Sequence, residues 1–465
     1  MSSSGSVRSF RLLVVGIGAA SAALACSDAT IGSVPGTRNT VVGTGPTVGT
    51  GGAAATSTTS SVTSGSGSAT VTTATTGTGG AGGAGGSGGE GAMDSGSISD
   101  VSSPPRDGPS TGYDSSAGDP GTEGDGIFNI TGPYSAAPEY TRQPGVPQGK
   151  VIRFTIASST IYPRAVNRAV AVYVPAQYKA GTPAAVMVFQ DGTNFYGFDS
   201  SVPTVFDNLI AKGSIPPIVG VFASNGGGDS VGSERGLEYD TVSGLYAEWA
   251  DKELLPRVEM ETKSQLPAQA VTFTQDPEGR GAVGGSSGGA ATFSMVWWRP
   301  DLFRRAITLS GTFVNQVPAN SPFPHGAWIY HDIDPYNAAA PNGLIVAFCE
   351  SAAGPKTTAA VEPCDTPLSK SACEAVSGCQ WNTSRNKPIR LWHEAGSNDN
   401  GAGGSPSTYR NFYLANQRMA AALKLRGYHF HFDDAAGAGH VDGAVLRQTL
   451  PAALVWLWRG YRAPQ

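Results

Sequence analysis

From residue 127 onward the chain alternates short apolar runs with longer segments whose apolar residues recur at helical spacing. The apolar runs predict strands at 151–157, 169–175, 184–190, 217–223, 281–285, 306–310, 389–394 and 429–432. The longer segments predict helices at 205–212, 245–259, 288–298, 408–426 and 444–461. Runs such as AAVMVFQ at 184–190 lack polar alternation, as expected for parallel strands buried on both faces. The pattern therefore predicts an α/β fold, a mostly parallel central sheet with helices on both faces.

Segment 27–126 follows a different pattern. It consists almost wholly of Gly, Ser, Thr, Ala and Pro, and Tyr113 is its one aromatic residue. Such a composition cannot bury enough apolar surface to offset chain entropy, so we expect a disordered, low-complexity tether. A flexible coil of this length has a root-mean-square reach of roughly 50–60 Å. The chain of 465 residues is therefore expected to hold one large domain, 127–465, rather than three.

The first 26 residues have the pattern of a secretory signal. Arg8 and Arg11 precede an apolar run at 12–25, which is shorter than the ~20 residues that span a bilayer. The run ends in the letters ALAC at Cys26, which resemble a bacterial lipoprotein box and make this cysteine a lipidation candidate. Ordinary signal cleavage just before Cys26 explains the same letters. We expect an exported protein, anchored in the bacterial cell envelope or secreted.

Composition narrows the classes of partner. The chain carries 31 Lys and Arg against 36 Asp and Glu, and the net charge of −5 comes with no basic stripe. Nucleic-acid binding is therefore not expected. The sequence leaves the oligomeric state open.

Four cysteines lie close together in a region rich in Ser, Ala and Pro: Cys349, Cys364, Cys373 and Cys379. In an exported protein they are expected to form two disulfides that stabilise a loop lacking its own core. The region is an insertion at about 321–388, and the sequence does not choose among its three disulfide pairings. A zinc site is the alternative, which the uneven spacing and the absence of a close C-x-x-C pair disfavour.

The main candidate for chemistry is Ser286. GGSSG at 284–288 fits G-x-S-x-G between a predicted strand and a predicted helix, the context of a nucleophile elbow. The backbone N–H of Ser287 is then expected to bind an oxyanion at the helix N-terminus. The alternatives are a Gly/Ser turn with no catalytic role, and a motif shifted by one residue, which would make Ser287 the nucleophile. GRGAVG at 279–284 matches G-x-G-x-x-G but would occupy the strand itself, so a dinucleotide site is not expected.

A general base is expected at His440, which stands in the loop between the last predicted strand and the last helix. Three of the six histidines fall within predicted strands, and two precede the insertion's cysteines; these are His393, His429, His431, His325 and His331. The order Ser, acid, His along the chain is typical of α/β-hydrolases.

The acid is expected at Asp399, on the loop that follows strand 389–394, where a carboxylate can orient an imidazole. Glu394 competes for this role, and Asp433 and Asp434 are weaker candidates. A solvated turn aspartate is the alternative interpretation of Asp399.

Several stretches together resemble the esterase family of α/β-hydrolases that includes enterochelin esterase-like and esterase D-like enzymes. They are VMVFQDG at 186–192, EYDT at 238–241, ELLP at 253–256, DPEGR at 276–280, GGSSGG at 284–289, GSND at 396–399, GHVDG at 439–443 and WLWR at 456–459. The resemblance implies a Ser286–Asp399–His440 triad. It also implies a second oxyanion donor in the loop 190–193, at Gly192 or Thr193. The insertion departs from the family and lies near the catalytic edge, so the resemblance alone does not identify the substrate.

We therefore expect a serine esterase that hydrolyses carboxylic esters through an acyl-enzyme intermediate, with no cofactor and no metal. Its substrate is expected to be a small-molecule or polysaccharide-linked ester: a siderophore ester, an acyl sugar or a short-chain ester. The alternatives are a lactonase or peptidase of the same fold, or a non-catalytic surface-binding lipoprotein built on a hydrolase scaffold.

Overall fold

The computed structural model describes residues 120–193, 195–229, 231–319, 321–333 and 340–462. All of them belong to one compact unit. The predicted signal segment, Cys26 and the tether as far as residue 119 lie outside the described residues.

A ten-stranded sheet forms the centre of the described fold, with the strand order β1-β12-β11-β8-β7-β4-β5-β3-β2 and β6 paired to β4. Within it, β2 pairs antiparallel with β3 and β3 with β5, whereas the other described pairs are parallel. The mostly parallel sheet expected from the apolar runs is confirmed. The strands are β1 (Gly126–Thr131), β2 (Lys150–Ile156), β3 (Arg168–Val174), β4 (Pro183–Gln190), β5 (Ile218–Ala223), β6 (Thr272–Phe273), β7 (Arg280–Gly285), β8 (Arg305–Leu309), β11 (Arg390–Gly396) and β12 (His429–Ala436).

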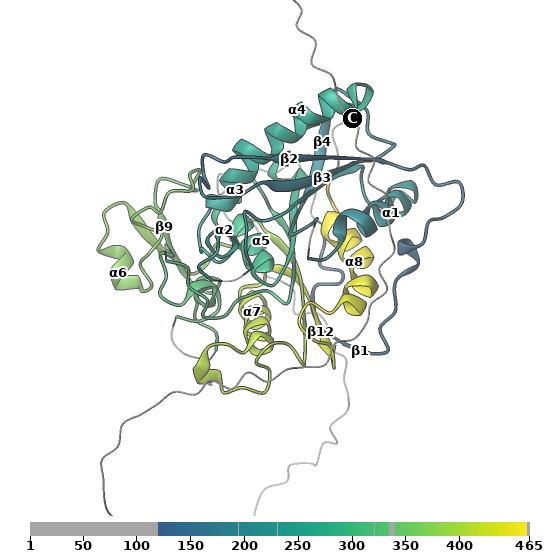
Figure 1. The fold of residues 1–465 in the computed structure, drawn as a ribbon. Coiled ribbons are helices and arrows are strands. Elements are labelled where there is room, and N and C mark those ends of the chain that lie inside the picture. The colour runs from purple at the N-terminus through teal and green to yellow at the C-terminus, as the bar shows by residue number, and fades with distance from the viewer. Residues whose placement is uncertain (1–119, 194, 230, 320, 334–339, 463–465) are drawn as a thin grey trace, which may run out of the picture. The chain divides into compact units, whose positions relative to one another are not determined.

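Helices cover both faces of the sheet (Figure 1). One apolar cluster joins the sheet to α1 (Phe198–Ala211) and α8 (Gly443–Trp458). A second cluster on the opposite face takes in α3 (Leu245–Trp249), α4 (Leu255–Gln265), α5 (Ser287–Trp298) and α7 (Phe412–Arg426). The short α2 (Glu234–Tyr239) contributes Tyr239 to this second cluster. No helix in the described ranges is both long and apolar enough to cross a bilayer.

The structure differs from the predicted elements at the N-terminal edge of the fold. The expected boundary after residue 126 falls within β1, which begins at Gly126 and lies parallel to β12. Just before it, the Asp125 carboxylate contacts His429 Nδ1 at 2.6 Å. This edge strand is mostly exposed, with none of its residues buried, and pairs with a strand about 300 residues later, so its local pattern is weak.

The predicted helix 245–259 consists of two α-helices joined by one wide turn. Between α3 and α4, residues Ala250–Leu254 form a π-helical turn, in which the Leu255 N–H donates to Ala250 O. Pro256, the second residue of α4, follows this turn, and because the residues before it are already helical its missing N–H leaves one bond of the helical segment unmade. The proline nevertheless does not end the segment, which continues to Gln265.

The cysteine-rich insertion contains a small hairpin of its own, β9 (Phe348–Ser351) with β10 (Cys379–Asn382), and the short α6 (Lys370–Glu374). The cysteines pair as Cys349–Cys373 and Cys364–Cys379, so the expected two disulfides are present. Because all four sulfurs are used, the zinc alternative does not hold for these cysteines. Figure 1 shows β9 and α6 at the side of the molecule away from α1 and α8.

A lysine anchors the C-terminal end of the insertion against the core. The Lys387 ammonium lies 4.8 Å from the Trp297 ring centre, 5.7 Å from that of Trp298 and 5.0 Å from that of Phe348. These are cation–π distances. Burial lowers the pKa of Lys387 to about 8. The two tryptophans close the C-terminal end of α5, so the insertion is attached to that helix.

The disulfides should contribute measurably to stability. We expect the double replacement Cys349→Ser and Cys373→Ser to lower the unfolding free energy by about 3 kcal/mol, because the bridge between these cysteines closes a loop in the unfolded chain and so reduces its conformational entropy. Thermal melts of the oxidised variant and wild type measure the loss. Wild type treated with reductant should melt at or below the variant's temperature. Equal melting of all three samples would contradict this assignment.

Candidate active site

Ser286 stands at a sharp turn between β7 and α5. Its backbone has φ 56° and ψ −127°, a left-handed conformation that residues other than glycine rarely adopt. The Ser286 N–H donates to Leu309 O at 2.9 Å, and the Ser286 carbonyl accepts from the N–H groups of Gly289 and Thr312. These bonds hold the strained residue in place from both sides. This is the geometry of a nucleophile elbow.

The neighbouring glycines are required by close approach. A Cβ on Gly284 would lie 2.2 Å from Gly288 O, and one on Gly285 would lie 2.8 Å from the Tyr196 ring. The first contact is with backbone, which cannot move aside without unwinding the start of α5. The glycines around Ser286 therefore let strand and helix meet at this angle.

The Ser286 hydroxyl lies 3.4 Å from Thr312 Oγ1, a long contact for two hydroxyls. Among the described residues, no hydrogen bond joins it to His440. The adjacent Ser287 has a different environment: its hydroxyl accepts from Gln316 Nε2, which also donates to Asp240 Oδ2 at 2.8 Å. Burial raises the pKa of Asp240 to about 6, even though hydrogen bonding with Gln316 and Ser287 lowers it.

The structure brings the predicted acid and base together. His440 Nδ1 and Asp399 Oδ1 lie 2.5 Å apart, and the Asp399 side chain is fully buried whereas that of His440 is 24% exposed. Asp399 Oδ1 also accepts from the Asn400 N–H at 2.6 Å. The ring of Phe412 packs edge-on against the imidazole at 5.1 Å. His440 is thereby oriented with Nε2 free of partners among the described residues.

The histidine loop contacts the elbow directly. A Cβ on Gly285 would lie 3.0 Å from Val441 Cγ1, so the residue before Ser286 packs against the residue after His440. The Val441 N–H donates to Ser310 Oγ at 2.9 Å, which ties this loop to the end of β8. All of these groups follow the carboxyl ends of parallel strands. They therefore gather at the sheet edge where α/β proteins bind their ligands.

Glu394, the competing acid, lies elsewhere. Its carboxylate accepts from Thr449 Oγ1 of α8 at 2.7 Å, and only its backbone oxygen reaches toward the site, where it accepts from the Ser310 N–H at 2.8 Å. The two weaker acid candidates are also engaged away from Ser286. Asp433 contacts His431, and Asp434 accepts from Tyr413.

The remaining histidines lie outside the site as expected. His393 is buried on β11 against the ring of Phe432, and burial lowers its pKa to about 3. His325 stacks on Tyr409, and His331 contacts Asp332.

Two backbone N–H groups at the candidate oxyanion positions have no hydrogen-bond partner in the described residues. One is that of Ser287, the first residue of α5; the other is that of Thr193. The Gly192 N–H, the other candidate for the second donor, is engaged: it donates to Ala223 O at 3.0 Å. Of the two predicted positions, Thr193 is therefore the one that can donate to a ligand.

The sequence did not indicate Thr312, Tyr196 or Gln316, which in the structure lie next to Ser286, Gly285 and Ser287 respectively. Each comes from a loop with no motif of its own, so no local signal identifies it. Nothing in the sequence singles out Arg235 either, although EYDT at 238–241 just after it belongs to the resemblance. Arg235 forms an ion pair with Asp191 in the loop before Gly192.

Within the described residues, no cluster of three or more His, Cys, Asp or Glu side chains could hold a metal ion. The groups at the elbow are a serine, a histidine–aspartate pair and free backbone donors. This set is suited to acyl transfer by a nucleophilic hydroxyl rather than to ligation.

A sheet of this order with a serine elbow after a central parallel strand defines an α/β-hydrolase. Residues 165–457 match the family described as "Putative esterase". The chain belongs to this esterase family, and is thus a carboxylic ester hydrolase, as the resemblance of its motifs implied.

Solved structures similar to the chain include a mutant feruloyl esterase module from Clostridium thermocellum complexed with sinapinate. It is 14% identical with a TM-score of 0.41, over 71% of this chain and 96% of that one. The ferric enterobactin esterase from Salmonella typhimurium is 18% identical with a TM-score of 0.43, over 68% of this chain and 60% of that one. A search of curated proteins gave no match. The family assignment accordingly rests on the family match.

Glu394 should make stability depend on pH. Burial, with Asp433 and Asp442 nearby, raises its pKa to about 8 from 4.5. The folded state therefore retains a proton that the unfolded chain releases above pH 4.5, so this stabilising contribution falls as pH rises from 4.5 to 8, by at most about 1.4 kcal/mol per pH unit. Glu394→Gln should remove this fall. Its melting temperature should exceed that of wild type by a margin that grows between pH 5 and 8; parallel curves would refute the assignment.

Proposed function

We propose that this chain is an exported serine esterase that hydrolyses carboxylic esters through an acyl-enzyme intermediate on Ser286. The observation that carries the proposal is the 2.5 Å contact between buried Asp399 and His440, on a loop packed against the strained elbow of Ser286. His440 serves as the general base and Asp399 fixes its tautomer.

In the first half of the reaction, rotation of the Ser286 side chain away from Thr312 brings its hydroxyl toward His440 Nε2. The hydroxyl proton passes to Nε2 as Ser286 Oγ bonds to the ester carbonyl carbon. The carbonyl oxygen becomes an oxyanion held by the N–H groups of Ser287 and Thr193. The bond to the leaving alcohol then breaks, and the alcohol oxygen takes the proton from His440. An acyl-Ser286 ester remains.

In the second half, a water molecule attacks the acyl-Ser286 carbonyl while His440 Nε2 takes one of its protons. A second oxyanion forms in the same place, and it collapses with release of Ser286 Oγ, which recovers the proton from His440. The product is a carboxylic acid. Asp399 holds the imidazole in place and stabilises the imidazolium that forms twice in the cycle.

The nucleophile is tested by covalent labelling with a fluorophosphonate, which reacts with activated serines. We expect wild type and Ser287→Ala to be labelled and Ser286→Ala not to be. Ser287 is the matched control because it is the adjacent serine and tests the shifted motif frame. Labelling that survives in Ser286→Ala would contradict the proposal.

The acid is tested by comparing Asp399→Asn with Glu394→Gln in the hydrolysis of p-nitrophenyl acyl esters. Asp399→Asn should reduce kcat by about 10⁴-fold, because the imidazole loses the carboxylate that holds its tautomer. Glu394→Gln should retain near wild-type kcat at neutral pH. A comparable loss in both variants would mean that Asp399 has no special role. The same assay, extended to lactones, peptides and to feruloyl and acetyl sugars, defines the substrate class.

Export and anchoring rest on the signal-like segment before Cys26, which lies outside the described residues. With the full chain expressed in a bacterial host, we expect the protein in the membrane fraction, exposed beyond the inner membrane. Cys26→Ala should release it into the soluble exported fraction, since the lipidated residue is lost. Unchanged membrane retention of Cys26→Ala would exclude anchoring through this cysteine.

A further inference from the structure

Asp191, directly after β4, has an unusual backbone and a fully buried charge. Its φ of 54° is left-handed, and its side chain is inaccessible to solvent. A non-glycine residue held in this region costs of order 1–3 kcal/mol, which persists only where the surroundings fix it. Asp191 takes no part in the proton transfers proposed above, so its strain and its buried charge need another explanation.

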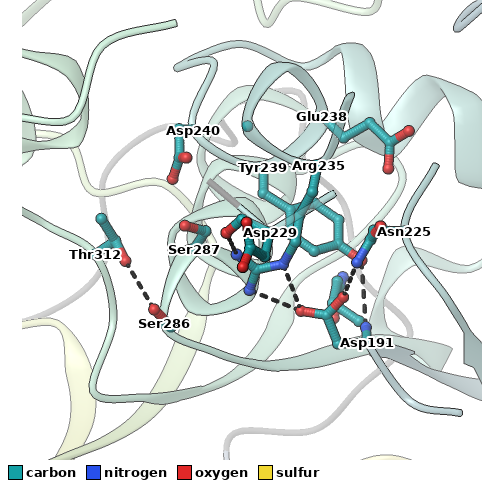
Figure 2. Close-up of polar contacts among 12 residues, drawn as sticks. Asp191, Asn225, Asp229, Arg235, Glu238, Tyr239, Asp240, Ser286, Ser287 and Thr312 are labelled. Atoms are coloured by element: carbon teal, nitrogen blue, oxygen red, sulfur yellow. Dashed lines mark hydrogen bonds and ion pairs between the residues drawn. The ribbon is translucent and has the colours of Figure 1, made fainter. Parts of the chain in front are cut away.

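The Asp191 carboxylate is bound on both oxygens (Figure 2). Oδ2 accepts from Arg235 Nε at 2.9 Å and Nη2 at 2.8 Å, and Oδ1 accepts from Asn225 Nδ2 at 2.8 Å. The two guanidinium bonds converge on Oδ2, and together with the Asn225 bond to Oδ1 they fix the direction of the carboxylate as well as its position. The Asp191 N–H in turn donates to Tyr239 Oη at 3.2 Å. The residue is therefore held through its side chain and its backbone at once.

Arg235 is itself fixed. It lies in α2 and is 5% exposed, with its guanidinium 5.0 Å from the ring centre of Phe195 and 5.2 Å from that of Tyr239. A third nitrogen, Nη1, donates to Asp229 O at 3.1 Å. The guanidinium thus has one orientation, set by two rings and the oxygens of Asp191 and Asp229.

The turn that follows Asp191 is fixed in the same way. The Gly192 N–H donates to Ala223 O and the Gly192 carbonyl accepts from the Asp199 N–H. A Cβ on Gly192 would lie 2.8 Å from Phe189 O and from Phe222 Cα, so the backbone is packed tightly against β5. The next N–H along the chain is that of Thr193, and it has no hydrogen-bond partner among the described residues.

The same turn packs against the helix that carries the other free donor. A Cβ on Gly288 would lie 3.2 Å from Gln190 Cβ, 3.8 Å from Asp191 Oδ2 and 3.9 Å from the Tyr239 ring. The ion pair is therefore adjacent to the first turn of α5, where Ser287 presents its N–H. Any shift of Asp191 changes the spacing between the two donors.

We propose that Asp191, Arg235 and Asn225 act as positioning residues that set the Thr193 N–H for binding the oxyanion. The inference rests on the proposed esterase reaction and adds an electrostatic condition to it. Arg235 neutralises the Asp191 carboxylate, which would otherwise be an uncompensated negative charge close to the developing oxyanion. Loss of Arg235 therefore destabilises the transition state in two ways. The turn relaxes, and the negative charge of Asp191 is no longer neutralised.

The test compares Arg235→Gln with Arg168→Gln, using a p-nitrophenyl ester that wild type hydrolyses. Arg168 and Glu238 form a second buried ion pair that also involves α2, with both side chains at most 1% exposed, but Arg168 has no contact with the 191–193 turn in the described residues. Arg235→Gln should reduce kcat by about 10- to 100-fold with KM changed less than about threefold, and weaken binding of a boronic acid that mimics the tetrahedral state by a similar factor. Arg168→Gln should lower the melting temperature and leave the kcat of the folded enzyme near wild type.

Adding Asp191→Asn to Arg235→Gln should restore part of the kcat, because the uncompensated charge is removed while the shape is kept. If Arg235→Gln does not fold, Asn225→Ala, which removes one hydrogen bond to Asp191, should show a smaller loss of kcat and of boronic acid affinity. Loss of stability with kcat and boronic acid affinity unchanged, in Arg235→Gln or in Asn225→Ala, would overturn the inference. A wild type that fails to hydrolyse esters or to be labelled at Ser286 would instead refute the proposed function.

Discussion

The close approach of β7 to the start of α5 is the constraint on which the rest of the site depends. At Gly284 and Gly288 the two backbones come so near that a Cβ would lie 2.2 Å from a carbonyl oxygen. The approach goes together with the left-handed backbone of Ser286 at the turn between the strand and the helix. It also places the Ser287 N–H at the start of a helix, where the helix dipole favours negative charge. One local contact thus positions the Ser286 hydroxyl and the Ser287 N–H together, the groups to which we assign the nucleophile and an oxyanion donor in the proposed function.

The sheet supplies the other groups because its central strands are parallel. β4, β7, β8, β11 and β12 all end at the same edge, and each leads into a loop that carries one part of the site. These loops are held by bonds between them, such as that from the Val441 N–H to Ser310 Oγ. The apolar clusters on both faces keep the strands in register, so the positions of the loops follow from packing far below them.

The sequence predicted those parts of the molecule whose signals are local. Three features can each be recognised from a few neighbouring residues: the strands buried on both faces, the G-x-S-x-G turn, and the single histidine in the loop between the last strand and the last helix. The choice of Asp399 over Glu394 also followed from position along the chain, and the contact with His440 agrees with it.

Features that depend on distant partners could not be predicted in this way. β1 pairs with β12 across about 300 residues, and its residues are mostly exposed, so its sequence resembles the end of the predicted tether as much as a strand. The choice between Gly192 and Thr193 required knowing that Ala223 already accepts from the Gly192 N–H. Arg235 is recognisable only once Asp191 is seen buried beside it.

The attachment of the insertion has a consequence for how the domain transmits strain. Both disulfides close within the insertion, so no described covalent bridge joins it to the core. Its contact with the core through Lys387 instead falls on Trp297 and Trp298, at the far end of the 12-residue helix that begins beside Ser286. An α-helix of that length spans about 18 Å and is stiff along its axis. A load applied to the insertion would therefore reach α5 at the end far from the elbow, and it would be shared with α7, where Arg418 donates to Asp332 and Arg426 to Val346 O.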